Sequence, residues 1–533
     1  MRRIIGCLLL IGLGSLGACY FPNKNLEAVR PDKLEKGKTI PTPTKVHLRD
    51  GTIILFQSGF VATEAVIKGE GRRFELGQPS KANLEAIEVP LDRIAAMTYC
   101  KDYVTTGGWV GTAILDATSW PLTALSVYCL FCPKCCFGSC PTVYVRDNDE
   151  FKLTAELFSF SVGSLMESDD LDLLAGPVGS SDRPFEMRVT NEALESHFIN
   201  YLRPEAVVHP RKTLVYPDAM GQPMLFRRFL SPEDVRNSQG EDVRESVSQV
   251  DQRLYRSPRS LVERLKDGPF FDYLDLKMKV PASATSVKLL LRMRNTLLTT
   301  LLFYDMVLGS QGLDALAWTE RMNTDPSYAG RFWSLYRLFS GIRVKVRTDT
   351  GWVAAGLVHD PGPIAFKRLA VRVPTFGREE VEVRLEFVPD NFMIDAVSFD
   401  YDEGPAVDVA VHPLEFDQVT DVEGRLRPDI QALVADKDDR YLDVEPGQAY
   451  RFVFDPPAPR SDEEEVSVFI ASRGYYNEWL RGTWLTSRPD PGYRFDLGDV
   501  GGTLRRLAES WLSSKEMLEE RFFKTRIPIR GER

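Results

Sequence analysis

The chain has 533 residues, of which 43% are hydrophobic and 27% are charged, so it has the composition of a globular protein with several domains. Its formal net charge of −10 argues against a nucleic-acid partner, because phosphate binding requires a basic surface, and we predict none. The same charge argues against electrostatic docking on anionic lipid. Any membrane contact must therefore come from another property of the chain.

The first residues combine a basic start, a short apolar run and small residues before a cysteine, ending in Leu16-Gly17-Ala18-Cys19. The run is too short to span a bilayer, so we interpret residues 1–18 as a cleaved signal peptide. The four residues resemble the lipobox of bacterial lipoproteins. That resemblance implies that Cys19 carries fatty acyl chains such as palmitate and anchors the chain in a membrane of the cell envelope. Because Tyr20 follows the cysteine, it also implies the outer membrane where the cell has two.

Residues 19–44 are charged and contain several prolines, and we interpret them as a tether. Residues 45–100 alternate apolar and polar positions between turns. Two strands within 46–56 flank Asp50-Gly51, which predicts a hairpin with a tight turn. Several short strands around one small core predict a compact, SH3-like β-barrel.

Residues 101–140 hold an apolar segment and a cluster of cysteines. The run 107–131 approaches the length of a membrane-spanning helix. Because it contains Asp116 and Trp120-Pro121, we favour a buried or interfacial helix and leave a second membrane contact open.

Six cysteines remain beyond the lipobox. They are Cys100, Cys129, Cys132, Cys135, Cys136 and Cys140. In an exported chain an even number of cysteines favours structural disulfides, with zinc and a redox dithiol as alternatives. The spacing approaches that of a bacterial ferredoxin, but Ser139 stands where the fourth ligand would be.

Residues 141–230 are predicted to form a β-rich domain that opens with a hairpin over 142–157. The segments Ser139-Cys140-Pro141-Thr142-Val143-Tyr144-Val145 and Met166-Glu167-Ser168-Asp169-Asp170-Leu171 resemble part of uncharacterised bacterial envelope proteins. Residues 231–265 are charged and poor in apolar periodicity, so we predict a linker.

Residues 266–405 contain many short alternating strands, interrupted by two helical patterns, and predict a β-sandwich of jelly-roll type. The closing strand, Phe392-Met393-Ile394-Asp395-Ala396-Val397, is similar to the one that ends galactose-binding-like jelly rolls. Those domains often bind carbohydrate and sometimes hold calcium. Asp395, Asp400, Asp402 and Glu403 are candidate calcium ligands, although a solvated acidic strand end is the favoured interpretation.

Residues 406–490 predict a second, small β-sandwich, and residues 491–533 an amphipathic C-terminal helix. Near the end of this sandwich, clustered aromatic residues follow an arginine. Arg473, Tyr475, Tyr476 and Trp479 are therefore a candidate surface for stacking on sugar rings or for a protein contact, against the alternative that they close the end of the sandwich.

No pattern of a known catalytic site is present. The five histidines do not stand at metal-ligand spacings, and there is no nucleophile elbow, phosphate loop or dinucleotide fingerprint. We predict a mainly β (α+β) envelope lipoprotein with a non-catalytic binding or assembly role, its ligand being a glycan or an envelope protein. The alternative is an enzyme that acts on envelope polysaccharide through a pair of carboxylates in a sandwich cleft. No cofactor is predicted, with structural calcium or zinc as the alternative.

Overall fold

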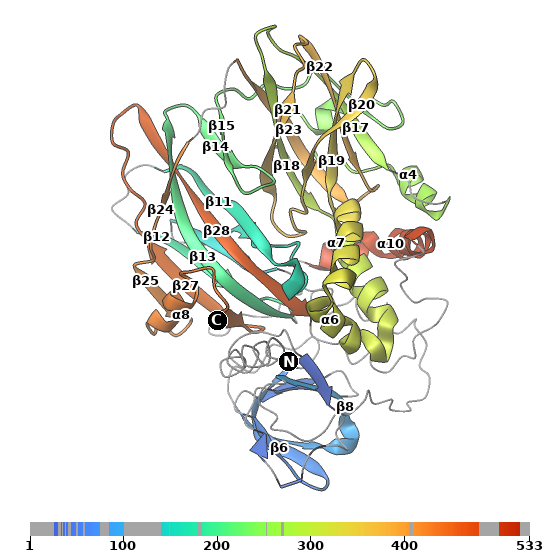
Figure 1. The fold of residues 1–533 in the computed structure, drawn as a ribbon, viewed down its shortest axis with the longest axis vertical. Helices are drawn as coiled ribbons and strands as arrows, with labels where there is room; N and C mark the ends of the chain where they lie inside the picture. Colours follow the sequence, from blue (N-terminus) through green and yellow to red (C-terminus); the bar gives the residue numbers. More distant parts are fainter. Residues whose placement is uncertain are drawn as a thin grey trace, which may run out of the picture.

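In a computed structural model the described residues are 26–29, 34, 36–37, 39–40, 44–48, 52–56, 59–74, 85–100, 140–148, 150–178, 184–193, 195–251, 253–267, 271–403, 409–478 and 500–522. The mainly β fold class is confirmed: antiparallel sheets form a small N-terminal unit and two sandwiches, with helices at their junction (Figure 1). None of the helices in the described part of the chain combines the length and the apolar composition needed to cross a bilayer. The predicted signal peptide and the apolar run 107–131 lie outside the described residues.

The N-terminal unit is one strongly curved sheet. Its strands are β1 (Leu26–Val29), β2 (Thr39–Ile40), β3 (Thr44–Leu48), β4 (Ile53–Phe56), β5 (Phe60–Ala62), β6 (Val66–Phe74), β7 (Glu85–Pro90) and β8 (Ile94–Cys100). The order is β1-β8-β3-β4-β6-β5-β2, with β7 beside β6, and the predicted hairpin is confirmed as the β3–β4 pair. Within the described residues β1 and β2 end the order without pairing to each other, so the unit is an open sheet where a closed barrel was predicted.

The first sandwich is built from ten strands. They are β9 (Thr142–Asp147), β10 (Glu150–Glu156), β11 (Ser168–Val178), β12 (Phe185–Thr190), β13 (Glu195–Pro210), β24 (Ala410–Pro413), β25 (Gln418–Asp421), β26 (Leu442–Val444), β27 (Ala449–Phe454) and β28 (Glu464–Glu478). One sheet has the order β10-β9-β12-β27-β25, and the other β11-β28-β13-β24 with β26 beside β13. The apolar faces of the two sheets form one core.

This arrangement corrects the predicted domain organisation. Residues 141–230 and 406–490 were expected to form separate units, yet β12 pairs with β27 and β13 pairs with β28 along most of its length. Strand periodicity shows which segments are extended but not which strands share hydrogen bonds. The second sandwich is therefore an insertion between the two halves of the first.

The second sandwich also has two antiparallel sheets. Its strands are β16 (Asp234–Asn237), β17 (Asp272–Lys279), β18 (Ser286–Asn295), β19 (Ile342–Thr348), β20 (Gly351–Val358), β21 (Lys367–Pro374), β22 (Glu380–Phe387) and β23 (Phe392–Asp402). The sheet β16-β17-β22-β19-β20 faces the sheet β21-β18-β23 across one core. The hairpin of β14 (Leu214–Pro217) and β15 (Pro223–Phe226) packs against the outer face of the smaller sheet.

The predicted linker 231–265 is part of this sandwich. β16 pairs with β17, and Val235, Val247 and Tyr255 are buried in the core. Leu261, Val262 and Leu265 near the end of the segment are buried as well. Because the buried apolar residues are widely and unevenly spaced, the segment shows no regular periodicity in the sequence.

Helices fill the junction between the sandwiches. They are α4 (Arg259–Glu263), α5 (Leu298–Leu301), a π-helix (Leu302–Leu308), α6 (Ala315–Thr324), α7 (Pro326–Ser340) and α10 (Val500–Phe522). Leu507, Trp511 and Leu518 on the buried face of α10 join a core that also includes residues of α5 to α7 and of the first sandwich. The predicted amphipathic C-terminal helix is thus confirmed, and it packs against the body of the protein.

Candidate functional site

The aromatic surface predicted near residue 475 is not exposed. Tyr475 is fully buried with its ring centroid 4.9 Å from that of Phe198, and Tyr476 is buried with its hydroxyl donating to the carbonyl of Ser159 at 3.0 Å. These two rings fill the end of the first sandwich, as the alternative interpretation held. Trp479 lies outside the described residues. Arg473 is partly exposed and lines a cleft.

Of the cysteines, only Cys140 has a described side chain. It is buried and its thiol is free, and burial raises its pKa well above the ordinary value. The predicted disulfide is therefore not formed at Cys140, and the raised pKa favours the protonated thiol. Cys19, Cys129, Cys132, Cys135 and Cys136 lie outside the described residues, as does the side chain of Cys100, so the pairing of these cysteines stays a prediction.

The four acidic residues considered as calcium ligands serve another purpose. Asp395 is buried and pairs with Arg292, while Glu403 accepts from Ser283 at 2.8 Å. Asp400 and Asp402 both pair with Lys288, at 3.0 and 2.9 Å. The charges of Asp395, Asp400 and Asp402 are thus neutralised by cations of the protein, and these three side chains are buried. Of the four, only Glu403 is exposed to solvent, as the favoured interpretation held. In the described part of the chain no group of three or more His, Cys, Asp or Glu side chains has the geometry of a metal site.

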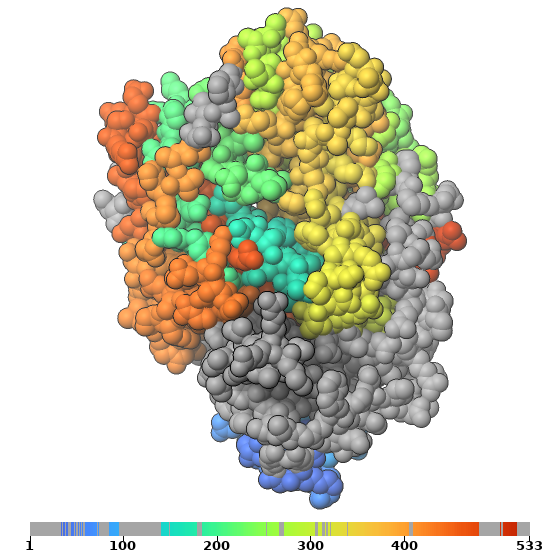
Figure 2. Space-filling view, viewed as in Figure 1, coloured from blue at the N-terminus to red at the C-terminus, as the bar shows by residue number. Residues whose placement is uncertain are grey.

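A cleft of about 440 Å³ lies where the sandwiches and α7 meet. Its walls are the start of β11, the turn between β14 and β15, one face of α7, and residues 359–369 of the second sandwich. On the face shown in Figure 2, the teal surface of the first sandwich lies between the green surface that includes the β14–β15 hairpin and the yellow surface of the helices. The cleft therefore combines segments that are far apart in the sequence.

The cleft has an aromatic wall supplied by α7. This helix begins where Asp325 accepts a hydrogen bond from the backbone N–H of Tyr328 at 3.0 Å, with Pro326 in the first turn. Trp333 is half-buried, and its ring centroid lies 6.2 Å from that of Phe160. One turn later the exposed Arg337 holds its guanidinium 6.0 Å from the Trp333 centroid. An aromatic face and a cation are thus presented side by side.

The floor of the cleft is a buried lysine held between two carboxylates. Lys367, at the start of β21, places its Nζ 3.0 Å from Asp170 and 2.9 Å from Asp172, both on β11. Burial alone would lower the pKa of Lys367, but the two carboxylates outweigh burial and raise it above the ordinary value. This contact joins the two sandwiches.

Two further buried carboxyls hold the segment before Lys367. Glu156 accepts hydrogen bonds from the backbone N–H groups of Ile364 at 2.7 Å and Ala365 at 2.8 Å, and burial raises its pKa to about 7. Asp360 accepts from the hydroxyl of Tyr336 at 2.6 Å, and burial raises its pKa to about 6. Both carboxyls therefore fix the shape of this segment.

The carboxylates of the cleft are occupied by protein donors. Asp169 is bonded to Lys437 at 2.7 Å and to Arg473 at 3.2 Å, and Asp170 and Asp360 hold the contacts described above. A hydrolase of the two-carboxylate type needs carboxyls that reach the substrate and the attacking water. Asp169, Asp170 and Asp360 are instead held by hydrogen bonds and ion pairs within the protein.

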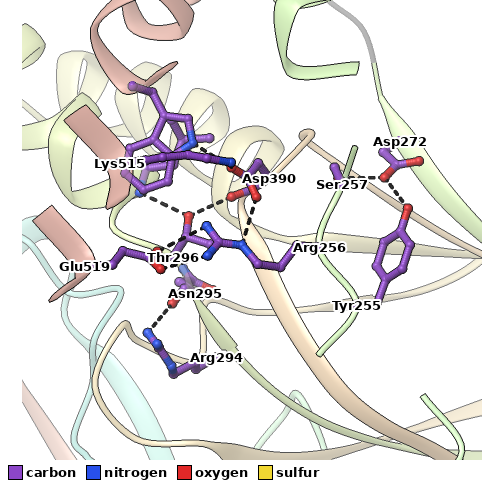
Figure 3. Close-up of polar contacts among 12 residues, drawn as sticks. Tyr255, Arg256, Ser257, Asp272, Arg294, Asn295, Thr296, Asp390, Lys515 and Glu519 are labelled. Atoms are coloured by element: carbon purple, nitrogen blue, oxygen red, sulfur yellow. Dashed lines mark hydrogen bonds and ion pairs between the residues drawn. The ribbon is translucent and has the colours of Figure 1, made fainter. Parts of the chain in front are cut away.

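A second polar cluster secures α10. Asp390 accepts from Lys515 at 3.0 Å and from Arg256 at 3.2 Å, and Arg256 also pairs with Glu519 at 2.9 Å (Figure 3). The indole of Trp511 donates to the same Asp390 at 2.8 Å. This cluster is buried between α10 and the second sandwich, so we assign it a structural role.

Apart from Arg473, sequence reasoning missed the residues of the cleft. Trp333 lies in the second of the two helical patterns predicted within 266–405, but nothing in the sequence indicated that its ring would be half-exposed. Lys367 carried a usable signal, because it shares the strand face that buries Leu369 and Val371. A lysine at such a core-facing position requires buried carboxylates nearby.

No family model matches the chain, and a search of the curated proteins found no match. Among solved structures, a GH31 alpha-xylosidase from Xanthomonas citri is similar with a TM-score of 0.17 and 8% sequence identity, over 85% of this chain and 38% of that chain. Tripeptidyl Peptidase 2 has a TM-score of 0.09 and 8% identity, over 82% of this chain and 23% of that chain. The chain spans less than half the length of either protein, and neither likeness carries an argument about function.

Proposed function

We propose that the chain is a lipid-anchored protein of the bacterial cell envelope that binds a glycan in the cleft without catalysing a reaction. The observation that carries this proposal is the half-buried Trp333 in a cleft of about 440 Å³ whose other walls carry charged groups of both signs. That volume falls within the roughly 300–1,000 Å³ of small-molecule sites. An aromatic face packs on the apolar face of a sugar ring, while flanking charged groups hydrogen-bond its hydroxyls.

The balance of charge in the cleft favours a neutral sugar. Lys367 is compensated by Asp170 and Asp172, and Arg473 is compensated by Asp169 at 3.2 Å and Glu167 at 3.6 Å. A strongly charged ligand would have to displace these pairs. Hydroxyl and amide groups can instead share the same donors and acceptors.

The lipid anchor rests on Leu16-Gly17-Ala18-Cys19, which lies outside the described residues. Intact-mass measurement of the protein purified from membranes tests it. We expect a chain that begins at Cys19 and carries the added mass of acyl groups, and Cys19→Ser should release the protein from the membrane. An unmodified Cys19 would contradict the anchor and leave the binding proposal standing.

Binding is tested by titration calorimetry with N-acetylglucosamine and its β-1,4-linked tetramer, which are neutral envelope-type sugars. We expect saturable binding that Trp333→Ala abolishes. Trp352→Ala is the matched control, since Trp352 lies on β20 and does not line the cleft. Absence of binding by the wild-type protein, or equal loss in both variants, would reject the proposal.

The enzymatic alternative is favoured by one observation, the raised pKa values of Glu156 and Asp360 beside the cleft. Release of reducing ends from the tetramer, lost in Asp360→Asn, would support hydrolysis. Because both carboxyls are held by backbone and side-chain donors, we expect no release.

A further inference from the structure

The cleft continues beyond Trp333 into a second hollow of about 220 Å³. The two hollows share Glu167, Ser168 and Trp333. The second one runs along the first half of α7, where Pro326, Ala329 and Gly330 face Leu165. Its volume is below that of an independent ligand site, so it is an extension of the cleft.

We propose that the two hollows form one groove along α7, which binds an oligosaccharide of at least two units that crosses Trp333. This inference rests on the proposed glycan binding and specifies the length and direction of the ligand. One unit occupies the charged cleft, and the next lies against Ala329 and Gly330.

Gly330 is the independent observation behind this inference. It lies in the interior of α7, where glycine costs about 1 kcal/mol relative to alanine. Its backbone is not in the left-handed region, and a Cβ added there would meet no atom within 4 Å. Neither backbone conformation nor packing inside the protein therefore requires glycine. The absent side chain instead leaves the floor of the second hollow open to the backbone, where a ligand can approach closely.

The distribution of charge sets the direction of the ligand. The cations that line the groove, Arg337, Lys367 and Arg473, all lie in the cleft. The second hollow has Glu167 as its single charged residue within the described chain, and Tyr441 donates to that carboxylate at 3.2 Å. The unit richest in hydrogen-bonding groups therefore occupies the cleft, and a ring with an apolar face covers Ala329 and Gly330.

The test compares N-acetylglucosamine with its tetramer on the full-length mature protein. We expect the tetramer to bind the wild type at least about tenfold more tightly than the monomer. Gly330→Leu, which fills the second hollow, should remove that gain and leave the affinity for the monomer unchanged. Ser334→Leu is the matched control, because Ser334 is an exposed residue of α7 that lines neither hollow. It should retain the gain.

Gly330→Ala controls for a folding defect in Gly330→Leu, because it adds only one methyl group and raises helix propensity. It should fold at least as stably as the wild type and reduce the tetramer's gain in part. Equal affinities of the wild type for monomer and tetramer, or a gain unaffected by Gly330→Leu, would overturn the extended groove while the cleft proposal stands. If neither sugar binds the wild type, the proposed function fails, and this inference fails with it.

Discussion

The same local device occurs twice in this molecule, with different consequences. Lys288 lies between Asp400 and Asp402, and Lys367 lies between Asp170 and Asp172. In each case a buried lysine on one strand binds two carboxylates spaced i, i+2 on another, so that both face the same side of their strand. Lys288 makes its contacts within one sheet, because β18 pairs with β23. Lys367 makes them between the two sandwiches.

The two sites also differ in the number of cations that pair with their carboxylates. Asp400 has a second cation in Arg228 at 3.2 Å, and Asp402 has one in Arg372 at 2.6 Å. Among the described residues, Lys367 is the single cation paired with Asp170 or Asp172. The contact that joins the sandwiches therefore depends on one cationic side chain. In the contact within the second sandwich, three cations neutralise the two carboxylates.

Lys367→Met should be the most damaging of the changes compared here. It leaves two carboxylates at the junction without a cation, and breaking a buried ion pair from one side costs about 3–5 kcal/mol. We expect a loss of this size in the free energy of unfolding, measured in urea. Hydrogen exchange should show the loss concentrated in residues 168–172 and 359–367.

A compensating variant sharpens this prediction. Adding Asp170→Asn and Asp172→Asn to Lys367→Met removes the unpaired charges and should recover part of the lost stability. If the triple variant is as unstable as Lys367→Met, the cost comes from packing and our electrostatic explanation is wrong.

The junction should also depend on pH through Glu156. Its pKa in the folded protein is about 7, above its ordinary value of 4.5, so the folded state binds the proton more tightly than the unfolded state. The resulting stabilisation is complete below the ordinary pKa and is lost as pH rises through about 7. We expect the free energy of unfolding to fall by roughly 2–3 kcal/mol between pH 5 and pH 8 from this group.

Glu156→Gln isolates that contribution, because the amide oxygen still accepts from Ile364 and Ala365 but does not titrate. The variant should show a shallower decline between pH 5 and pH 8, with Asp360, whose pKa is about 6, supplying part of the remainder. Parallel pH profiles for the variant and the wild type would show that Glu156 does not titrate in this range.

Lys288→Met should cost less than Lys367→Met, about 1–2 kcal/mol, because Arg228 and Arg372 still neutralise the two carboxylates. The loss should come mainly from the carbonyl of Leu225, to which Lys288 donates at 2.6 Å. Urea unfolding under the same conditions gives the comparison. A cost equal to that of Lys367→Met would show that the neighbouring arginines do not neutralise the carboxylates when Lys288 is absent.

The two lysine sites show which features of the fold could be predicted from the sequence and which could not. Alternation correctly predicted the strands that carry Lys288 and its carboxylates, but Asp400 and Asp402 were interpreted as part of a solvated strand end. The hairpin β14–β15, some sixty residues earlier, covers the outer face of their sheet and buries Lys288 beside Phe226. Burial by a distant segment is not encoded in the local pattern of a strand.

The cleft was harder still to predict, because it depends on which sheets share strands. Arg473, a candidate surface residue near the end of the first sandwich, is partly exposed in the cleft. Tyr475 and Tyr476 are buried, so the alternative that they close the end of the sandwich is correct. The partners of Arg473 come from β11, and the opposite wall comes from α7 in the inserted sandwich. The cleft could be predicted only by someone who knew that β28 pairs with β11 and β13, and the sequence pattern does not show this pairing.

The smallest effect is expected at the rim of the same junction. Lys437 pairs with Asp169 at 2.7 Å, one residue before Asp170 on β11, but both side chains are about half exposed, at 44% and 53%. Lys437→Met should therefore change the free energy of unfolding by less than about 1 kcal/mol. Lys437 and Lys367 contact adjacent aspartates on one strand, so the pair of variants compares an exposed with a buried lysine. If Lys437→Met costs as much as Lys367→Met, burial is not the reason that the junction depends on Lys367, and the contrast between the two sandwich sites would have to be explained by their geometry alone.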